Sequence, residues 1–413
     1  MIENCIGIMP LPLGLGVGFK VNQKNFIVPM SVEEPSVIAA CSAIAKIIST
    51  HGSGFECYSS PPIMTGQIQI TEITDYDRIE FLLKRDKDKV IRYANSHCLS
   101  MTQRGGGVVD LKWRRLSEDM MVVELDVNVC EAMGANAINT IAEATAPFIH
   151  SLIGQGQIGI RILTNLCTER MTMATFEIPV EKLAWKGAAG ELVARKIIEA
   201  QRFAELDQYR ATTHNKGIMN GIDAVAIALG QDWRAIESAA HSYAAIGGRY
   251  MPLSSYKLEK GIFKGKIKLP IAVGTKGGAL SSNPGYINTL QIMGNPTATE
   301  IAQVMASVGL ANNFAALRAM GIEGIQRGHM DLHARNVAIQ AGLPTDLVTQ
   351  AAQFMKVRNK INVRTAQQYA QSLEQFSKSQ SERVQTQDLS SFYVEIAEDF
   401  LPKPLVLTIL LDC

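Results

Sequence analysis

The chain has 413 residues, of which 47% are apolar and 19% are charged, and its formal net charge is +1. This length accommodates roughly two or three domains with cores of their own, and this composition excludes a disordered chain. The small net charge argues against broad electrostatic binding of nucleic acid or of an anionic membrane. The seven cysteines include no Cys-x-x-Cys pair, which predicts reduced thiols in a cytoplasmic protein and neither a disulfide framework nor a zinc ribbon.

The first 60 residues combine two strands with a helix. The segment FKVNQKNFIVPM predicts two strands around an Asn-Gln-Lys-Asn turn. Glu33 and Glu34 precede Pro35, and both acids and proline suit the first turn of a helix, which we expect to end near Thr50. The glutamate pair therefore has two interpretations: helix-start chemistry, or a carboxylate aimed into a cleft at the helix start.

Pro61 and Pro62 predict a domain boundary, after which the sequence alternates between predicted strands and helices. The segments that follow are the strand GQIQITEI, a charged helix over 75–97, the strands RGGGVVDLKWRRL and MMVVELDVNVC, the helix EAMGANAINTIAEATAPFIHSLI and the strand QIGIRILTN. Strand–helix–strand–strand–helix–strand is the split βαβ order of a ferredoxin-like domain. We therefore expect an α+β insert over residues 61–164.

Helices dominate the sequence after residue 190. Strands are expected around 261–273, followed by the turn GTKGGALSSNPG and a helix that begins with a capping arrangement at Thr297–Glu300. The tail from about residue 344 reads as helical. No window approaches a transmembrane span, and the N-terminus does not resemble a signal peptide.

The stretch from Tyr209 to Trp233 gathers polar and flexible residues unusually densely for so apolar a chain. Gly217 and Gly221 predict a loosened turn at Lys216, and a short apolar run then leads to Asp232. A lysine among backbone amides, with an acid partner, presents a fixed positive charge to a developing oxyanion. The alternative is a surface loop with an ordinary Lys–Asp pair.

His329 and His333 lie four residues apart on a predicted helix, which raises the question of a zinc site. The glutamate of the zincin pattern is absent, because position 330 is methionine and position 331 is aspartate. Two ligands without a third do not make a zinc site. We therefore expect no metal.

Six short segments follow one another along the chain. They are IENCIG, VEEPS, EAMGAN, HNKGIMNGID with the following DW, GTKGGAL and RGHMDLHARN. Together they resemble the motifs of class II hydroxymethylglutaryl-coenzyme A (HMG-CoA) reductases, the soluble bacterial form, and their shared order is far more specific than any one of them. The C-terminal PLVLTILLDC has no counterpart in this pattern.

The resemblance implies a fold and an activity. The fold is α+β: a discontinuous coenzyme A-substrate domain over 1–60 and 165–324, a ferredoxin-like NAD(P)-binding domain over 61–164, and a C-terminal helical flap over 325–413 that carries a catalytic histidine at its start. The activity is the four-electron reduction of (S)-HMG-CoA to (R)-mevalonate and coenzyme A by two equivalents of NADPH or NADH, or the reverse, degradative direction. A cytoplasmic homodimer or higher homo-oligomer is implied as well.

The resemblance also implies site residues. Glu34 is implied to donate a proton to the reacting oxygen, and Lys216 to bind that oxygen electrostatically. Asp232 is implied to hold the lysine–glutamate network, and His329 to protonate the departing coenzyme A thiolate. The implied substrate contacts are Ser36, Asn165, Arg210 and Asn220. The implied cofactor contacts are Glu131, Met133, Gly134, Asn136, Gly277 and Gly278, with Cys98 beside the ribose. These residue types suit the chemistry, since a cation stabilises the hemithioacetal oxygen and a histidine protonates the thiolate.

The sequence departs from the family pattern before the first motif and at the first residue of EAMGAN. The family has a helical segment before IENVIG that contributes to dimer contact and substrate binding, whereas this chain starts at Met1–Ile2. Glu131 stands where the family has aspartate. A non-catalytic alternative therefore stays open, namely an inactive remnant of the enzyme that binds coenzyme A or a partner protein.

The third departure concerns the cofactor. Cys98 occupies the aligned position at which NAD-preferring relatives carry an acid, and an acid on the ribose 2′-hydroxyl repels a 2′-phosphate. The sequence therefore predicts that NADPH is accepted, with Arg92, His97 or Arg104 as partners of the phosphate. In the alternative, Glu131 or another acid contacts the ribose and NADH is preferred.

Overall fold

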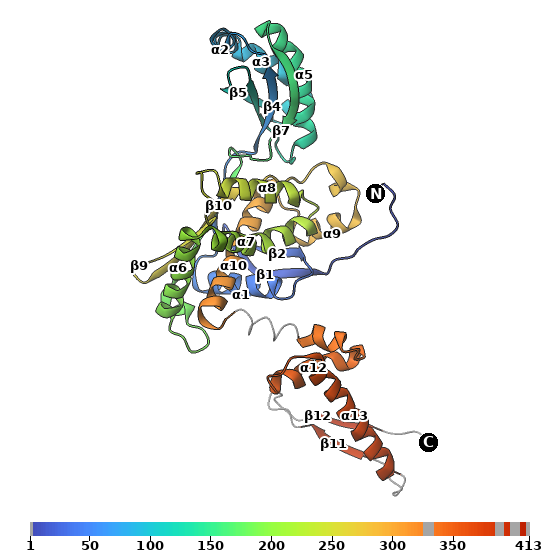
Figure 1. Cartoon of the computed structure of the whole chain (residues 1–413). Helices are drawn as coiled ribbons and strands as arrows, with labels where there is room; N and C mark the ends of the chain where they lie inside the picture. The colour runs from blue at the N-terminus through green and yellow to red at the C-terminus, as the bar shows by residue number, and fades with distance from the viewer. Residues whose placement is uncertain (1–2, 325–333, 385–391, 397–404, 410–413) are drawn as a thin grey trace. The chain divides into compact units, whose positions relative to one another are not determined.

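The structure is a computed structural model that describes residues 3–324, 334–384, 392–396 and 405–409 (Figure 1). The chain divides into two units, Met1–Ile325 and Gln326–Cys413. Within the described ranges, no helix is both long and apolar enough to cross a membrane.

The first unit is built around α10 (Ala298–Ile322), most of whose residues are buried on every side. A helix that is apolar all round belongs in a core. It starts with the predicted capping box, in which Thr297 and Glu300 exchange side-chain and backbone hydrogen bonds. The helices α1 (Val37–His51), α6 (Gly190–Leu206) and α7 (Gln208–Ala228) pack against it.

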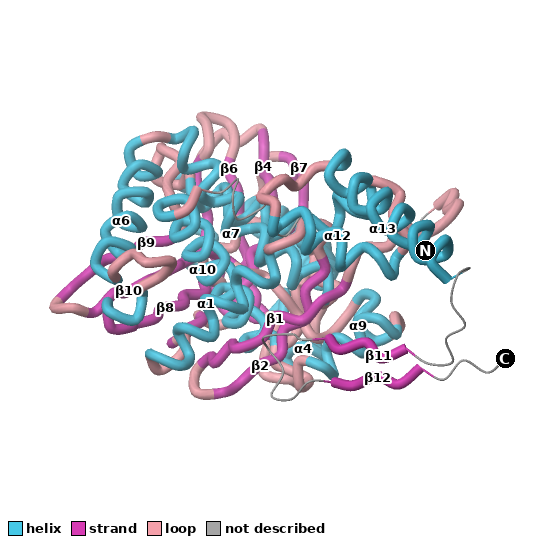
Figure 2. Tube along the Cα trace, turned by 90° about the horizontal axis from the view of Figure 1, so that it is seen from below, coloured by secondary structure: helices cyan, strands magenta, loops and turns pink. Residues whose placement is uncertain are grey.

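A four-stranded antiparallel sheet packs against α10 as well (Figure 2). Its order is β3 (Glu56–Ser59), β8 (Met171–Pro179), β10 (Ile262–Pro270) and β9 (Ser254–Glu259). Phe176 and Phe263 point inward and lie 5.4 and 5.5 Å from Phe314 of α10, centroid to centroid. Because side chains alternate along a strand, Lys266 and Lys268 of β10 are exposed on the other face. The sequence does not predict β9 as a separate strand.

The N-terminal strands form the predicted hairpin, β1 (Leu13–Val21) with β2 (Lys24–Ser31). The helix-start interpretation of Glu33 and Glu34 is wrong, because α1 begins only at Val37 and has no acid in its first turn. The physical reason lies at Ser36, whose left-handed backbone (φ 87°) separates the acids from the helix. Both glutamates belong to the loop between β2 and α1.

A second antiparallel sheet has the order β5-β6-β4-β7 and a hydrophobic core of its own. Its elements are β4 (Ile63–Thr71), α2 (Tyr76–Arg85), α3 (Lys87–Ser96), α4 (Leu99–Thr102), β5 (Gly107–Arg115), β6 (Met121–Asn128), α5 (Ala135–Ile153) and β7 (Gln157–Leu163). The single charged helix expected over 75–97 is two helices separated at Asp86, a residue type that competes with helical hydrogen bonding. In Figure 1, α5 lies along β4 and β7.

The remaining elements of the first unit are short. They are η1 (Val180–Leu183), α8 (Trp233–Ala244), η2 (Gly278–Ser281) and α9 (Pro284–Ile292). The turn expected at GTKGGALSSNPG therefore contains a 3₁₀ turn and the start of a helix.

The second unit contains α12 (Thr345–Val357), α13 (Val363–Val384), β11 (Phe392–Ile396) and β12 (Leu405–Ile409), after a helical stretch over 334–340. The helical tail expected from residue 344 is correct for α12 and α13. It is wrong for β11 and β12, which pair as antiparallel strands. The segments FYVEI and LVLTI are rich in β-branched and aromatic residues, which favour strands.

Candidate active site

Lys216 lies in the middle of α7, so the predicted loose turn is wrong. The structure explains the glycines around it differently. A Cβ at Gly221 would lie 3.0 Å from Val308 Cγ1 and 3.2 Å from Asn312 Cβ of α10. Asn312 also donates a hydrogen bond to the Gly217 carbonyl at 2.6 Å. Glycine at 221 therefore lets two helices approach closely, while α7 stays continuous.

Lys216 forms an ion pair with Glu34, with 3.5 Å between Nζ and Oε2. The side chains are 62% and 34% exposed, so the pair is open to a ligand on its solvent side. Asn220 follows Lys216 by one helical turn on the same face, and Ser36 follows Glu34 by two residues. A lysine held by a carboxylate and open on one side can stabilise an oxyanion.

Asp232 lies at the start of α8. Its Oδ1 accepts a hydrogen bond from the Ala235 N–H at 3.1 Å, which caps the helix, and lies 3.4 Å from Arg234 Nη2. Within the described part of the chain, Lys216 pairs with Glu34, and Asp232 forms no hydrogen bond or ion pair with either. The role of Asp232 in the lysine network stays a prediction.

Among the described residues, Arg210 and Asn165 form no hydrogen bond or ion pair with Lys216 or Glu34. Arg210 begins α7, where its N–H donates to Asp207 Oδ2 at 2.8 Å, and burial lowers the pKa of its guanidinium. Its Nε is buried without a hydrogen-bond partner among the described residues. Asn165 is exposed in the loop between β7 and β8. His329 and His333 lie outside the described residues.

The two segments predicted to hold the cofactor lie side by side, although more than a hundred residues separate them in sequence. The Thr275 N–H donates to the Glu131 carbonyl at 2.8 Å, and Ala132 and Lys276 form a parallel bridge. The Glu131 carboxylate accepts hydrogen bonds from Thr275 Oγ1 and from the Ala298 N–H, both at 2.8 Å. One oxygen of Glu131 thus ties this turn to the start of α10.

Both of these segments contain glycines with a positive φ. Gly134 precedes α5 with φ 107°, and a Cβ there would lie 2.6 Å from Val129 Cγ1. Gly277 and Gly278 have φ of 95° and 55°, and a Cβ on either would meet open space. Asn136 is exposed in the first turn of α5. Open glycines beside the N-terminus of a helix fit the phosphate groups of a dinucleotide.

Arg170 is a residue that sequence reasoning missed. It is 5% exposed and donates hydrogen bonds to the carbonyls of Ala132, Met133 and Val273, so it joins the two cofactor segments. Burial lowers the pKa of its guanidinium to about 10. A lone arginine between two strands carries no sequence signal of this role.

Cys98 precedes α4, and its thiol lies 3.6 Å from Asn95 Oδ1 at the end of α3. Burial raises the pKa of this thiol. Of the three candidate partners for a 2′-phosphate, Arg104 has a contact with the cofactor region: its carbonyl lies 3.7 Å from the Sγ of Cys130, which precedes Glu131. The Arg104 side chain is exposed.

Comparison with known proteins identifies the family. The model of the family described as hydroxymethylglutaryl-coenzyme A reductase matches residues 1–334. The chain belongs to the HMG-CoA reductase family. The resemblance found in the sequence motifs is thereby confirmed.

Several relatives in this family match over most of the chain. A 3-hydroxy-3-methylglutaryl-coenzyme A reductase of Archaeoglobus fulgidus is 44% identical over 377 residues, covering 90% of this chain and 85% of that protein. A Borreliella burgdorferi protein, described as a probable reductase of the same name, is 36% identical, covering 82% and 77%. The class II reductase of Streptococcus pneumoniae, solved bound to NADPH in open conformations, is 39% identical, with a TM-score of 0.76 and coverage of 90% and 91%.

A cluster of titratable groups lies between α7 and α8 of this HMG-CoA reductase family member. Burial, and then a hydrogen bond with Glu237, raise the pKa of Asp223 to about 9. Glu237 lies 2.6 Å from His241 Nε2, and His241 Nδ1 lies 2.7 Å from the Tyr250 hydroxyl. The raised pKa favours the protonated form of the buried Asp223 carboxyl at neutral pH, which its place in HNKGIMNGID does not reveal.

We expect Asp223→Asn to stabilise the protein at alkaline pH. Folded Asp223 keeps its proton up to about pH 9, whereas the unfolded side chain loses it near ~4, so the stability of the parent falls as pH rises between these values. Asparagine mimics the protonated acid and removes this loss. The gain should grow by at most ~1.4 kcal/mol per pH unit.

Thermal unfolding of parent and variant from pH 5 to pH 9 measures this gain. Asp77→Asn, at an exposed position on α2, is the control and should leave the profile unchanged. Parallel profiles for parent and Asp223→Asn would contradict the raised pKa of Asp223 in the folded protein.

Proposed function

We propose that this protein reduces (S)-HMG-CoA to (R)-mevalonate and coenzyme A with two equivalents of NADPH or NADH. The observation that carries the proposal is the solvent-open Lys216–Glu34 pair, with a separation of 3.5 Å, formed by two motifs of the family pattern. The bound nicotinamide supplies the hydrides. The same site serves the reverse, degradative direction.

The side chains of this chain handle the charge and the protons of the reaction. Lys216 binds the thioester oxygen and stabilises its negative charge as the hemithioacetal forms. Glu34, whose carboxylate lies 3.5 Å from the ammonium group of Lys216, donates the proton that turns an alkoxide into a hydroxyl. Asp232 supports the pair, and His329 protonates the departing coenzyme A thiolate. Ser36, Asn165, Arg210 and Asn220 bind the substrate.

The proposed cofactor domain spans residues 61–164 and is ferredoxin-like. Its support is the antiparallel order β5-β6-β4-β7, which is that of a split βαβ unit, and a separate hydrophobic core. The proposed substrate domain comprises 1–60 and 165–324. Residues 325–413 are the proposed flap, which begins with the segment that carries His329.

We also propose that the protein is a cytoplasmic homodimer. Apolar side chains are exposed along the N-terminal segment and β1, among them Ile8, Leu13, Leu15 and Val17. An exposed apolar strip of this kind is typical of a surface that another chain covers.

The test is an assay that follows oxidation of NADPH and of NADH on addition of HMG-CoA, with chromatographic detection of mevalonate. We expect substrate-dependent oxidation and mevalonate formation. Absence of both with either nucleotide would favour the alternative, an inactive protein that binds coenzyme A or a partner.

We expect Arg104→Gln to lower kcat/KM for NADPH by about tenfold and to leave kcat/KM for NADH within about twofold. Tenfold corresponds to ~1.4 kcal/mol, a reasonable loss for one exposed arginine–phosphate contact. The control is Arg78→Gln, at an exposed position on α2, which should change neither kcat/KM by more than about twofold. Equal losses with both nucleotides in Arg104→Gln would remove Arg104 from the selectivity site.

A further inference from the structure

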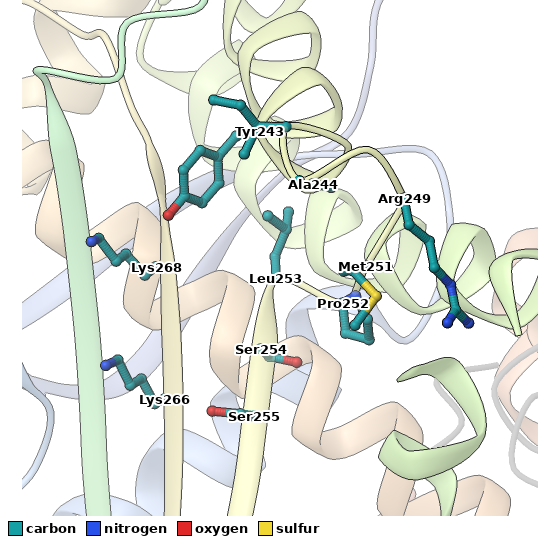
Figure 3. Close-up of a pocket in the computed structure, with 12 residues that line it drawn as sticks. Tyr243, Ala244, Arg249, Met251, Pro252, Leu253, Ser254, Ser255, Lys266 and Lys268 are labelled. Carbon is teal, nitrogen blue, oxygen red and sulfur yellow. The ribbon is translucent and has the colours of Figure 1, made fainter. Parts of the chain in front are cut away.

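A cavity of about 550 Å³ lies between the end of α8 and strands β9 and β10 (Figure 3). None of the residues predicted to bind substrate or cofactor lines it. One wall is apolar, formed by Tyr243, Ile246, Met251 and Pro252. Its volume is that of a pocket for a small organic molecule.

Every charged side chain that lines the cavity is a cation. They are Arg249 from the loop after α8, and Lys266 and Lys268 from β10. In Figure 3 the two lysines stand one above the other along β10, with Arg249 on the other side of the view. Clustered cations without a carboxylate raise the local concentration of anions.

The rest of this sheet shows that the lack of carboxylates is confined to the cavity. Lys257 of β9 pairs with Glu259 at 2.6 Å, and Lys264 of β10 pairs with Glu177 at 2.9 Å. Among the described residues, no carboxylate pairs with Arg249, Lys266 or Lys268. Neighbouring lysines on the same face are thus neutralised, whereas those at the cavity are left available.

The loop that lines the cavity is held in place from behind. The Asn215 side chain donates to the Met251 carbonyl at 2.9 Å and accepts from the Leu253 N–H at 3.0 Å. Ser254 Oγ donates to Asn313 Oδ1 at 2.8 Å and lies 2.7 Å from His214 Nε2. Because these hydrogen-bond partners are buried, the loop is already ordered before a ligand binds, so binding costs little conformational entropy there. Asn215 also precedes Lys216, which joins the wall to the helix of the active site.

We propose that this cavity binds a nucleoside diphosphate, at a site separate from the Lys216–Glu34 pair and from the cofactor segments. Two phosphoryl groups match the three cations in charge, and the base covers the apolar wall. Inorganic phosphate alone leaves that wall uncovered, and an uncharged aromatic ligand leaves the cations unpaired. The proposal concerns binding and does not depend on the proposed reaction.

The experiment is calorimetric titration of the full chain with ADP, in the presence of saturating NADPH and coenzyme A, which occupy the sites of the proposed reaction. Pyrophosphate and adenosine are titrated separately. We expect ADP to bind, pyrophosphate to bind more weakly, and adenosine not to bind.

Variants then locate the site. Lys266→Gln/Lys268→Gln should weaken ADP binding on the order of 10- to 100-fold, through the loss of two charged contacts. The control pair Lys257→Gln/Lys264→Gln removes the same charge from the same sheet and should change binding by less than about threefold. Arg249→Gln, on an exposed loop, tests the other side of the cavity if the lysine pair fails to fold, and should weaken binding as well.

Three results would overturn the proposal. They are absence of ADP binding to the parent, equal weakening by the two lysine pairs, and binding of adenosine as tight as that of ADP. A protein that shows no HMG-CoA reduction but binds ADP with the expected variant pattern would refute the proposed reaction and still support this site.

Discussion

Lys216→Ala is expected to lower kcat for HMG-CoA reduction by about 10²–10³, the usual effect of removing one oxyanion-stabilising group. Lys216 projects from the interior of a 21-residue helix and pairs with Glu34, so its ammonium group is held in place before the substrate arrives. Alanine keeps the helix, because it is the strongest helix former. The loss should therefore fall on the chemical step and leave the fold unchanged.

The measurement is steady-state kinetics with HMG-CoA, together with thermal unfolding of the same samples. Lys196→Ala is a matched control, since Lys196 is also a partly exposed helical lysine paired with a glutamate, Glu199, at 2.8 Å. We expect the control to keep kcat within about twofold, because exposed pairs contribute little. A Lys216→Ala enzyme within a few-fold of the parent would show that the charge on the reacting oxygen is stabilised elsewhere.

Arg170→Met should destabilise the first unit by ~3 kcal/mol or more. The guanidinium donates to three backbone carbonyls, and each buried carbonyl left without a donor costs about 1–3 kcal/mol. Methionine fills much of the volume, so the loss reports the hydrogen bonds more than a cavity. Since Ala132 and Met133 belong to the proposed cofactor turn, NADPH affinity should fall in the protein that still folds.

Urea unfolding and NADPH titration test both parts of this expectation. Arg114→Met is the control, because Arg114 is 55% exposed and pairs with Glu124 on the sheet surface. It should change the free energy of unfolding by less than ~1 kcal/mol. If the two arginine variants were equally stable, the three carbonyls would have found other donors, and Arg170 would not hold the cofactor segments together.

The sequence by itself determined the features that depend on local pattern. Alternating and helical periodicity predicted the hairpin of β1 and β2 and the four strands and the long helix α5 over 61–164, and Thr297 with Glu300 predicted the start of α10. Six ordered motifs predicted the family, which the match over 1–334 confirmed. These signals are readable because each is carried by residues that are neighbours in the chain.

Only the tertiary structure decided what distant residues do to one another. Gly221 predicts a turn from sequence alone, yet it faces Val308 of another helix, so its missing side chain serves a helix contact and Lys216 stays on a continuous helix. Arg170 and the raised pKa of Asp223 likewise depend on partners far along the chain or on burial. A residue's type sets what it can bond, but the folded neighbours set which bond it forms, and a single sequence does not contain that pairing.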